Sequence, residues 1–166
     1  MPASTHDASS DRALLRALAA FRYQLRIFLH FSEEAAHDAG LQPQQHQLLL
    51  QIAGIAEGEE ATVAYAAERL GLRHNSTVEL VDRSVAQGLL LRAEDPGNRR
   101  RILLRITPHG EEVLRQLSAF HAHELHDLAP ELLRSIRGIG RMQAVTRARQ
   151  RELQTAKPQT RHEPRA

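Results

Sequence analysis

Two neighbouring stretches decide the fold of this chain: STVELVDR at residues 76–83 and DPGNRRR at residues 95–101. The first stretch has helical spacing with one polar face, and the second is a basic turn between two apolar runs. A short polar helix beside an arginine-tipped β-hairpin is typical of a winged helix-turn-helix. In that fold the helix enters the major groove of duplex DNA and the hairpin reaches phosphates or the minor groove.

The residues before the first stretch complete a helix-turn-helix. Thr62 is a plausible N-cap for a helix over 63–70, and Gly71 ends that helix. A second helix begins two residues later, capped by His74 or Asn75, with valines at 78, 81 and 85 within about 60° of one another. Two short helices joined by a tight turn predict that the second one is the reading helix.

The second stretch lies between two short apolar runs. Residues 89–92 and 101–106 predict two strands around a Pro-Gly-Asn turn, with about six residues in the loop. Thr107 and Pro108 then predict the start of a further helix, with a hydroxyl cap and proline in the first turn.

Long helices flank this central region. Apolar periodicity predicts helices over 11–39, 43–56, 108–127 and 130–153, and Gly138 with Gly140 indicates a kink or the close approach of another helix. We therefore expect a mainly α fold with a small β-hairpin wing. The winged helix-turn-helix occupies 41–107, dimerisation helices occupy 11–40 and 108–153, and residues 1–10 and the basic 154–166 are expected to be disordered.

Composition excludes several classes of protein. No apolar run approaches the roughly 18 residues that span a bilayer, and the first residues do not resemble a secretory signal, so we expect a cytoplasmic protein. The chain has no cysteine, hence no disulfide and no thiol switch. It also lacks a glycine-rich phosphate loop, a nucleophile elbow and an HExxH helix, so we expect no catalytic residues, no cofactor and no enzyme activity.

The net charge of +2 is too small by itself to indicate a nucleic-acid partner, but arginines concentrate locally around the wing and toward the C-terminus. The polar face of the reading helix and the wing supply the candidate contacts to double-stranded DNA. They are Thr62, Asn75, Ser76, Thr77, Glu79, Arg83, Arg99, Arg100 and Arg101. Thr62 is more simply explained as a helix cap, although such caps also present backbone N–H groups to phosphate.

Residues 70–110 resemble the MarR (multiple antibiotic resistance regulator) family of transcription factors. The resemblance rests on LVDR at 80–83, Gly88-Leu89, the Asp95-Pro96 and Arg99-Arg100 pairs of the wing, and LRITPHG at 104–110. It implies a homodimer whose terminal helices interdigitate and whose two winged helices bind a pseudo-palindromic operator. The surplus apolar surface of the flanking helices agrees with a homodimer.

Family analogy also implies a repressor released by a small aromatic or phenolic effector. Its pocket would be lined by Phe28, His30, Phe31 and His46, although core packing is the simpler role for the two phenylalanines. Three residues depart from the family pattern: Glu79 replaces a common basic residue, Ser84 a leucine, and Asn98 an aspartate of the wing. We expect the wing to be mobile without DNA.

Two alternatives remain open at this stage. The wing and tail could bind another protein instead of DNA. Alternatively, a metal could regulate DNA binding, because His121, His123 and His126 share one predicted helix. Their spacing does not fit a helical two-histidine site, which needs residues i and i+4, so we assign no metal ligand.

Overall fold

The computed structural model describes the backbone of residues 5–155 and the side chains of 11–98, 101–144, 147 and 148. Its elements are α1 (Thr5–Asp38), α2 (Pro43–Ala53), α3 (Val63–Leu70), α4 (His74–Ala86), β1 (Leu90–Asp95), β2 (Asn98–Ile106) and α5 (Pro108–Thr155). The chain divides into two compact units. Residues 28–126 form the wing unit, and residues 5–27 with 127–155 are the described part of the terminal unit.

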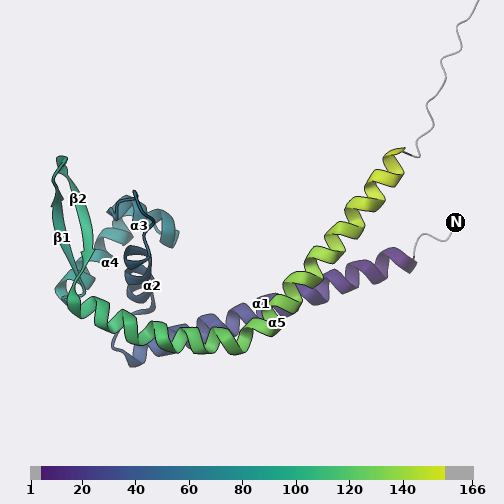
Figure 1. The fold of residues 1–166 in the computed structure, drawn as a ribbon, viewed down its shortest axis with the longest axis horizontal. Coiled ribbons are helices and arrows are strands. Elements are labelled where there is room, and N and C mark those ends of the chain that lie inside the picture. The colour runs from purple at the N-terminus through teal and green to yellow at the C-terminus, as the bar shows by residue number, and fades with distance from the viewer. Residues whose placement is uncertain (1–4, 156–166) are drawn as a thin grey trace, which may run out of the picture. The chain divides into compact units, whose positions relative to one another are not determined.

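The wing unit is a winged helix-turn-helix, as the sequence predicts. Figure 1 shows α2, α3 and α4 grouped together, with the β1–β2 hairpin projecting beside them. Its core consists of the buried aliphatic side chains Leu48, Leu49, Ile52, Leu80, Val81, Leu89, Leu90, Leu104, Leu114 and Leu117. Burial of these side chains fixes which face of α4 points inward and which remains exposed.

The hairpin is longer than the sequence predicts. Leu90 pairs with Ile106, and the antiparallel register continues to a bulge before Asp95, which pairs with Asn98. Only Pro96 and Gly97 connect the strands, so the expectation of six loop residues is wrong. The Asp95 carboxylate accepts a hydrogen bond from the Gly97 amide at 2.8 Å, and this local turn allows the strands to extend.

The base of the wing is joined tightly to the start of α5. The Thr107 hydroxyl donates to the carbonyl of Gly88 at 2.6 Å and accepts from the amide of Gly110 at 3.0 Å. A Cβ atom at Gly110 would lie 2.3 Å from the Leu89 carbonyl oxygen. The predicted hydroxyl cap at Thr107 is confirmed, and only glycine fits at position 110 without rearrangement.

Three helix boundaries differ from expectation. A single helix, α5, replaces the two predicted over 108–153 and passes through Pro130. Proline removes one helical hydrogen bond there, but Leu125, Leu128 and Leu132 keep the same helical period on both sides. Helix α1 begins at Thr5 instead of Asp11, and Arg73 is the N-cap of α4 without a side-chain hydrogen bond, in place of His74 or Asn75. Of the ends predicted to be disordered, residues 5–10 and 154–155 are helical, so the prediction is wrong there, and residues 1–4 and 156–166 lie outside the described residues.

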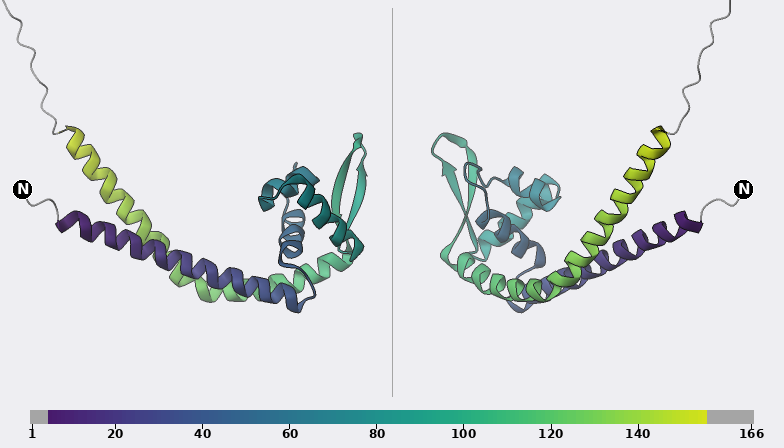
Figure 2. Two further views of the ribbon diagram at one scale, coloured as in Figure 1. Left: turned by 180° about the vertical axis from the view of Figure 1, so that it is seen from behind. Right: turned by 45° about the vertical axis from the view of Figure 1, so that its right-hand side comes forward.

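In the terminal unit, α1 and α5 run antiparallel and separate toward the chain ends (Figures 1 and 2). A Cβ atom at Gly138 would lie 3.3 Å from the Cβ of Ala17, so the predicted close approach of a second helix is confirmed. Large apolar side chains remain exposed on both helices of this unit, namely Leu15, Leu18, Leu25, Leu133 and Ile136.

Candidate nucleic-acid interface

Helix α4 presents one polar face. The side chains of Asn75, Ser76, Glu79 and Arg83 are all exposed, as the helical period predicts. The opposite face is buried through Leu80 and Val81. The four exposed residues offer amide, hydroxyl, carboxylate and guanidinium groups, which together recognise both donors and acceptors on base edges.

Thr77 does not belong to this face, and its assignment as a DNA contact is wrong for this structure. Its side chain is fully buried, and its hydroxyl donates to the Arg73 carbonyl at 3.1 Å. At about 100° per residue, position 77 shares the inner side of the helix with Leu80, Val81 and Ser84. The helical period therefore contained the signal that separates Thr77 from its neighbours.

A salt bridge connects the wing to the reading helix. The guanidinium of Arg92 in β1 lies 2.5 Å from the Asp82 carboxylate of α4. Ten residues separate the two side chains in sequence, so only the packing of β1 against α4 brings them together. Both groups are partly exposed, and the pair positions the hairpin more than it stabilises the fold.

Arg101 is held by two carboxylates instead of extending freely. Its guanidinium pairs with Glu60 and lies 3.6 Å from the Asp95 carboxylate. Arg101 was predicted to contact DNA, and in this structure phosphate would compete with both carboxylates. The side chains of Arg99 and Arg100, the other two predicted wing contacts, lie outside the described residues.

Thr62 acts as the predicted N-cap of α3. Its hydroxyl accepts a hydrogen bond from the Tyr65 amide at 3.1 Å. The next turn carries an exposed Arg69, whose guanidinium lies over the Tyr65 ring at 5.1 Å and 3.4 Å from the Glu59 carboxylate. These contacts order the first helix of the helix-turn-helix.

Ser84, which departs from the family pattern, belongs to a buried polar network. Its hydroxyl donates to the Leu80 carbonyl at 2.8 Å and accepts from the Gln45 amide at 3.4 Å. The Gln45 amide also donates to Gln87 at 2.8 Å. A leucine would remove this connection between α2 and α4, so the serine is matched to Gln45 of this chain.

Two histidines stack inside the wing unit. The rings of His46 and His121 are 4.7 Å apart and nearly parallel, and Phe28 and Phe31 contact His121 edge-on. The Nε2 atom of His121 lies 2.9 Å from the Ser32 hydroxyl. Burial and, to a smaller extent, the nearby His121 lower the pKa of His46 to about 4. His46 is therefore neutral at physiological pH.

The predicted effector residues are only partly brought together. Phe28, Phe31 and His46 gather around His121, whereas His30 is exposed and its Nε2 lies 3.4 Å from the Glu34 carboxylate. A hollow of about 420 Å³ adjoins Phe31. It is lined by Phe31, Glu34, Ala35, Asp38, Ala39, Gln116, Leu117 and Phe120.

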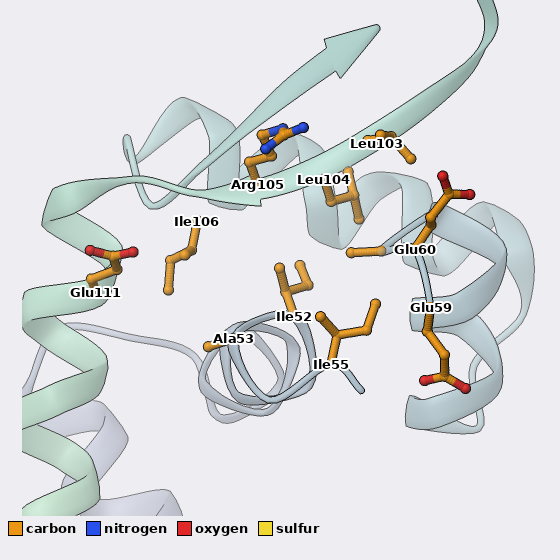
Figure 3. Close-up of a pocket in the computed structure, with 11 residues that line it drawn as sticks. Ile52, Ala53, Ile55, Glu59, Glu60, Leu103, Leu104, Arg105, Ile106 and Glu111 are labelled. Atoms are coloured by element: carbon orange, nitrogen blue, oxygen red, sulfur yellow. The ribbon is translucent and has the colours of Figure 1, made fainter. Parts of the chain in front are cut away.

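A second pocket, of about 560 Å³, lies between the end of α2, the 54–62 loop and β2. Figure 3 shows an apolar floor with Ile52 and Ile55, and the carboxylates of Glu59, Glu60 and Glu111 around it. These carboxylates would repel phosphate, so the pocket does not extend the candidate DNA surface.

Two other kinds of feature are absent from the described part of the chain. Within that part of the chain, no three histidine or carboxylate side chains gather where a metal ion could bind. Over the same residues, no helix combines the length and apolarity that crossing a membrane requires.

Comparison with known proteins relates part of this chain to a family. Residues 39–101 match the family model described as MarR family. A search of curated proteins found no match. The crystal structure of a MarR family transcription regulator is 17% identical, covers 93% of this chain and 100% of its own, and superposes with a TM-score of 0.67.

Two structures of proteins called CouR are also similar, and the one bound to p-coumaroyl-CoA comes from Rhodococcus jostii RHA1. CouR bound to a 23-mer DNA duplex is 26% identical and covers 76% of this chain and 87% of its own, with a TM-score of 0.56. CouR bound to p-coumaroyl-CoA is 23% identical and covers 82% and 88%, with a TM-score of 0.54.

Two short helices with an exposed polar reading face, followed by a two-stranded wing, define a winged helix-turn-helix protein. Residues 39–101 match the MarR family model, and the fold is similar to that of MarR family transcriptional regulators.

Proposed function

We propose that this regulator binds a pseudo-palindromic operator in double-stranded DNA as a homodimer, and that a small ligand releases it from the operator as a repressor. The observation that carries the proposal is the exposed polar face of α4 beside a wing that the Arg92–Asp82 pair ties to it. We assign the protein no catalytic reaction.

Within this proposal, the two elements have different roles. Asn75, Ser76, Glu79 and Arg83 read base edges in the major groove, and Glu79 favours the N4 amino group of cytosine. Arg99 and Arg100 of the wing supply phosphate contacts, which determine affinity more than sequence preference.

Exposed apolar side chains support the homodimer. Leu15 is 65% exposed and Leu133 is 48% exposed, and further leucines and isoleucines of α1 and α5 accompany them. A second copy that covers these side chains removes their apolar area from water. Two-fold pairing also places two reading helices on half-sites about one helical turn apart, roughly 10 base pairs.

The hollow beside Phe31 is the proposed effector site. Phe31, Leu117 and Phe120 form its apolar wall, and Gln116, Glu34 and Asp38 supply polar groups at its edge. This combination suits a small aromatic molecule with a polar substituent. The relative CouR, crystallised with p-coumaroyl-CoA, supports a ligand of aromatic character.

Selection of bound sequences from random duplexes tests the operator. We expect an enriched pseudo-palindrome, and Glu79→Gln should change the preferred bases while leaving the salt dependence of binding nearly unchanged. Arg99→Ala with Arg100→Ala should instead reduce the slope of log affinity against log salt. Selection that yields no common sequence would refute operator binding.

A ligand screen on the isolated operator complex then tests release. Aromatic acids and phenols that dissociate the complex should lose their effect in Phe120→Ala, which widens the hollow without touching α4. Dissociation by a chelator alone would point to a metal in place of this effector. Retention of a protein partner without any DNA binding would favour a protein-interaction module.

A further inference from the structure

Charge is distributed unevenly between the two units of the chain. Residues 28–126 contain nine arginines against fourteen aspartates and glutamates, so the unit that holds the reading helix and wing is acidic. Residues 1–27 and 127–166 contain thirteen arginines and lysines against six carboxylates. The excess of positive charge therefore belongs to the terminal parts of the chain and not to the proposed operator-binding unit.

Helix α1 carries one row of arginines. No carboxylate occurs between Asp11 and Glu33, and the arginines at 12, 16, 22 and 26 are all exposed. At about 100° per residue they fall within an arc of roughly 120°, over about 21 Å of helix. Tyr23 lies within the same arc and is 61% exposed.

Helix α5 repeats this arrangement. Its sequence has no carboxylate between Glu131 and Glu152, and Arg134, Arg137 and Arg141 are exposed within an arc of roughly 60°. Together with Pro130 and Leu133 they line a shallow pocket of about 360 Å³. Of the described arginines in this unit, Arg134 alone forms an ion pair, with the neighbouring Glu131.

The arginine rows overlap the apolar surface that a second copy would cover at Leu15, which lies within the arginine arc of α1, but most of that apolar surface lies beside the rows. Leu18 and Leu25 of α1 lie on the arc next to the arginines, and Ile136 holds the corresponding place on α5. Pairing through these apolar side chains leaves the guanidinium groups at the edge of the covered surface, accessible to a further partner.

We propose that the arginine rows of α1 and α5 form a second DNA-binding surface, which holds the phosphates of duplex DNA without reading its sequence. This surface goes beyond the proposed operator contact and does not depend on whether the wing binds DNA. Unpaired guanidinium groups form bidentate hydrogen bonds with phosphate oxygens. A protein partner would require several apolar anchors among the charges. Within the arginine arc of α1 the large apolar side chains are Tyr23 and Leu15, and Leu15 belongs to the proposed dimer surface.

Salt titration of nonspecific DNA binding tests the proposal. The probe is a fluorescent duplex of mixed sequence and about three helical turns, roughly 30 base pairs, measured by anisotropy at several salt concentrations. The full chain carries Arg99→Ala and Arg100→Ala, so that the proposed wing contacts do not contribute. Arg16→Gln, Arg22→Gln and Arg26→Gln are then added, first singly and then together.

Each arginine that contacts a phosphate should lower the slope of log affinity against log salt by about 0.9, and the triple variant by up to about 2.7. Arg115→Gln is the matched control, because this exposed arginine of the wing unit is already paired with Glu112 and should leave the slope unchanged. Sedimentation and thermal melting of each variant establish that assembly and folding are retained. If the triple variant does not assemble or fold normally, the slopes of the single variants are used in its place.

An unchanged slope in the folded variants would overturn the proposal. The proposal would also be overturned if the folded variants lost binding to polyglutamate but kept their binding to DNA. That result would assign the arginines to an acidic protein partner. The proposed wing contacts are removed in every sample. A negative result would therefore count against the second DNA-binding surface alone, and operator binding would still be tested by the selection experiment.

Discussion

The histidine pair inside the wing unit makes the folding stability depend on pH. Burial holds the pKa of His46 near 4, well below its ordinary value of 6.5, and the neighbouring His121 adds to this effect. Its Nδ1 atom is buried and has no hydrogen-bond partner among the described residues. A proton bound there would leave a charged donor without an acceptor, so the folded state resists protonation.

The direction and size of the effect follow from proton linkage. Between pH 6.5 and about 4, the unfolded chain binds a proton at His46 that the folded chain does not, so the free energy of unfolding falls as the pH falls. The loss is about 1.4 kcal/mol per pH unit and reaches roughly 3 kcal/mol near pH 4. Above pH 6.5 both states hold a neutral His46, and this contribution no longer changes.

His46→Phe isolates this contribution, because a phenyl ring keeps the stack with His121 and does not titrate. Urea unfolding of both proteins between pH 8 and 4.5 gives the free energy of unfolding at each pH. The wild-type protein should lose roughly 2 to 3 kcal/mol more than the variant across this range. Other titrating groups are common to both proteins and cancel in the difference.

Equal pH dependence in the two proteins would refute the reasoning. It would mean that His46 is protonated as easily in the folded state as in the unfolded one. His30→Phe serves as the control, because this histidine is exposed beside Glu34 and its replacement should leave the pH dependence of stability nearly unchanged.

Three other substitutions test the packing and the caps. Gly110→Ala should lower stability by about 1–3 kcal/mol in urea unfolding, because its Cβ would meet a wing carbonyl at 2.3 Å, whereas Gly140→Ala in open space should raise stability by up to about 1 kcal/mol. Thr62→Ala should cost about 1 kcal/mol through loss of the α3 cap, and Thr62→Ser should retain most of that stability. Asp95→Ala should increase hydrogen exchange at the wing tip, since it removes the acceptor of the Gly97 amide, and an unchanged exchange rate would contradict that role.

The sequence predicts local features of this protein well. The N-cap at Thr62, the hydroxyl cap at Thr107 and the close helix approach at Gly138 are all confirmed. The two caps depend on hydrogen bonds within a few neighbouring residues, and Gly138 lacks the side chain that would keep a second helix at a distance. The winged helix and the resemblance to the MarR family are confirmed for a related reason, since the reading helix and the wing are close together in sequence.

Predictions that depended on how a helix or strand packs against the rest of the fold were less accurate. Pro130 predicts a helix end, but the helix continues because its apolar period is unbroken on both sides. Thr77 was counted with the polar residues around it, although its helical position turns it toward Leu80 and Val81. The hairpin extends past its expected end because the Asp95 side chain closes a two-residue turn.

The sequence by itself determined the helices of the winged helix-turn-helix, the wing, the polar residues of the reading helix and the arginine segments without carboxylates on either side of it. Tertiary structure alone decided which partners these side chains have. Arg101 meets Glu60, Arg92 meets Asp82, and His46 stacks on His121, in each case across at least ten residues of chain. No local spacing encodes such pairs, because they form only when burial of the shared core brings separate elements together.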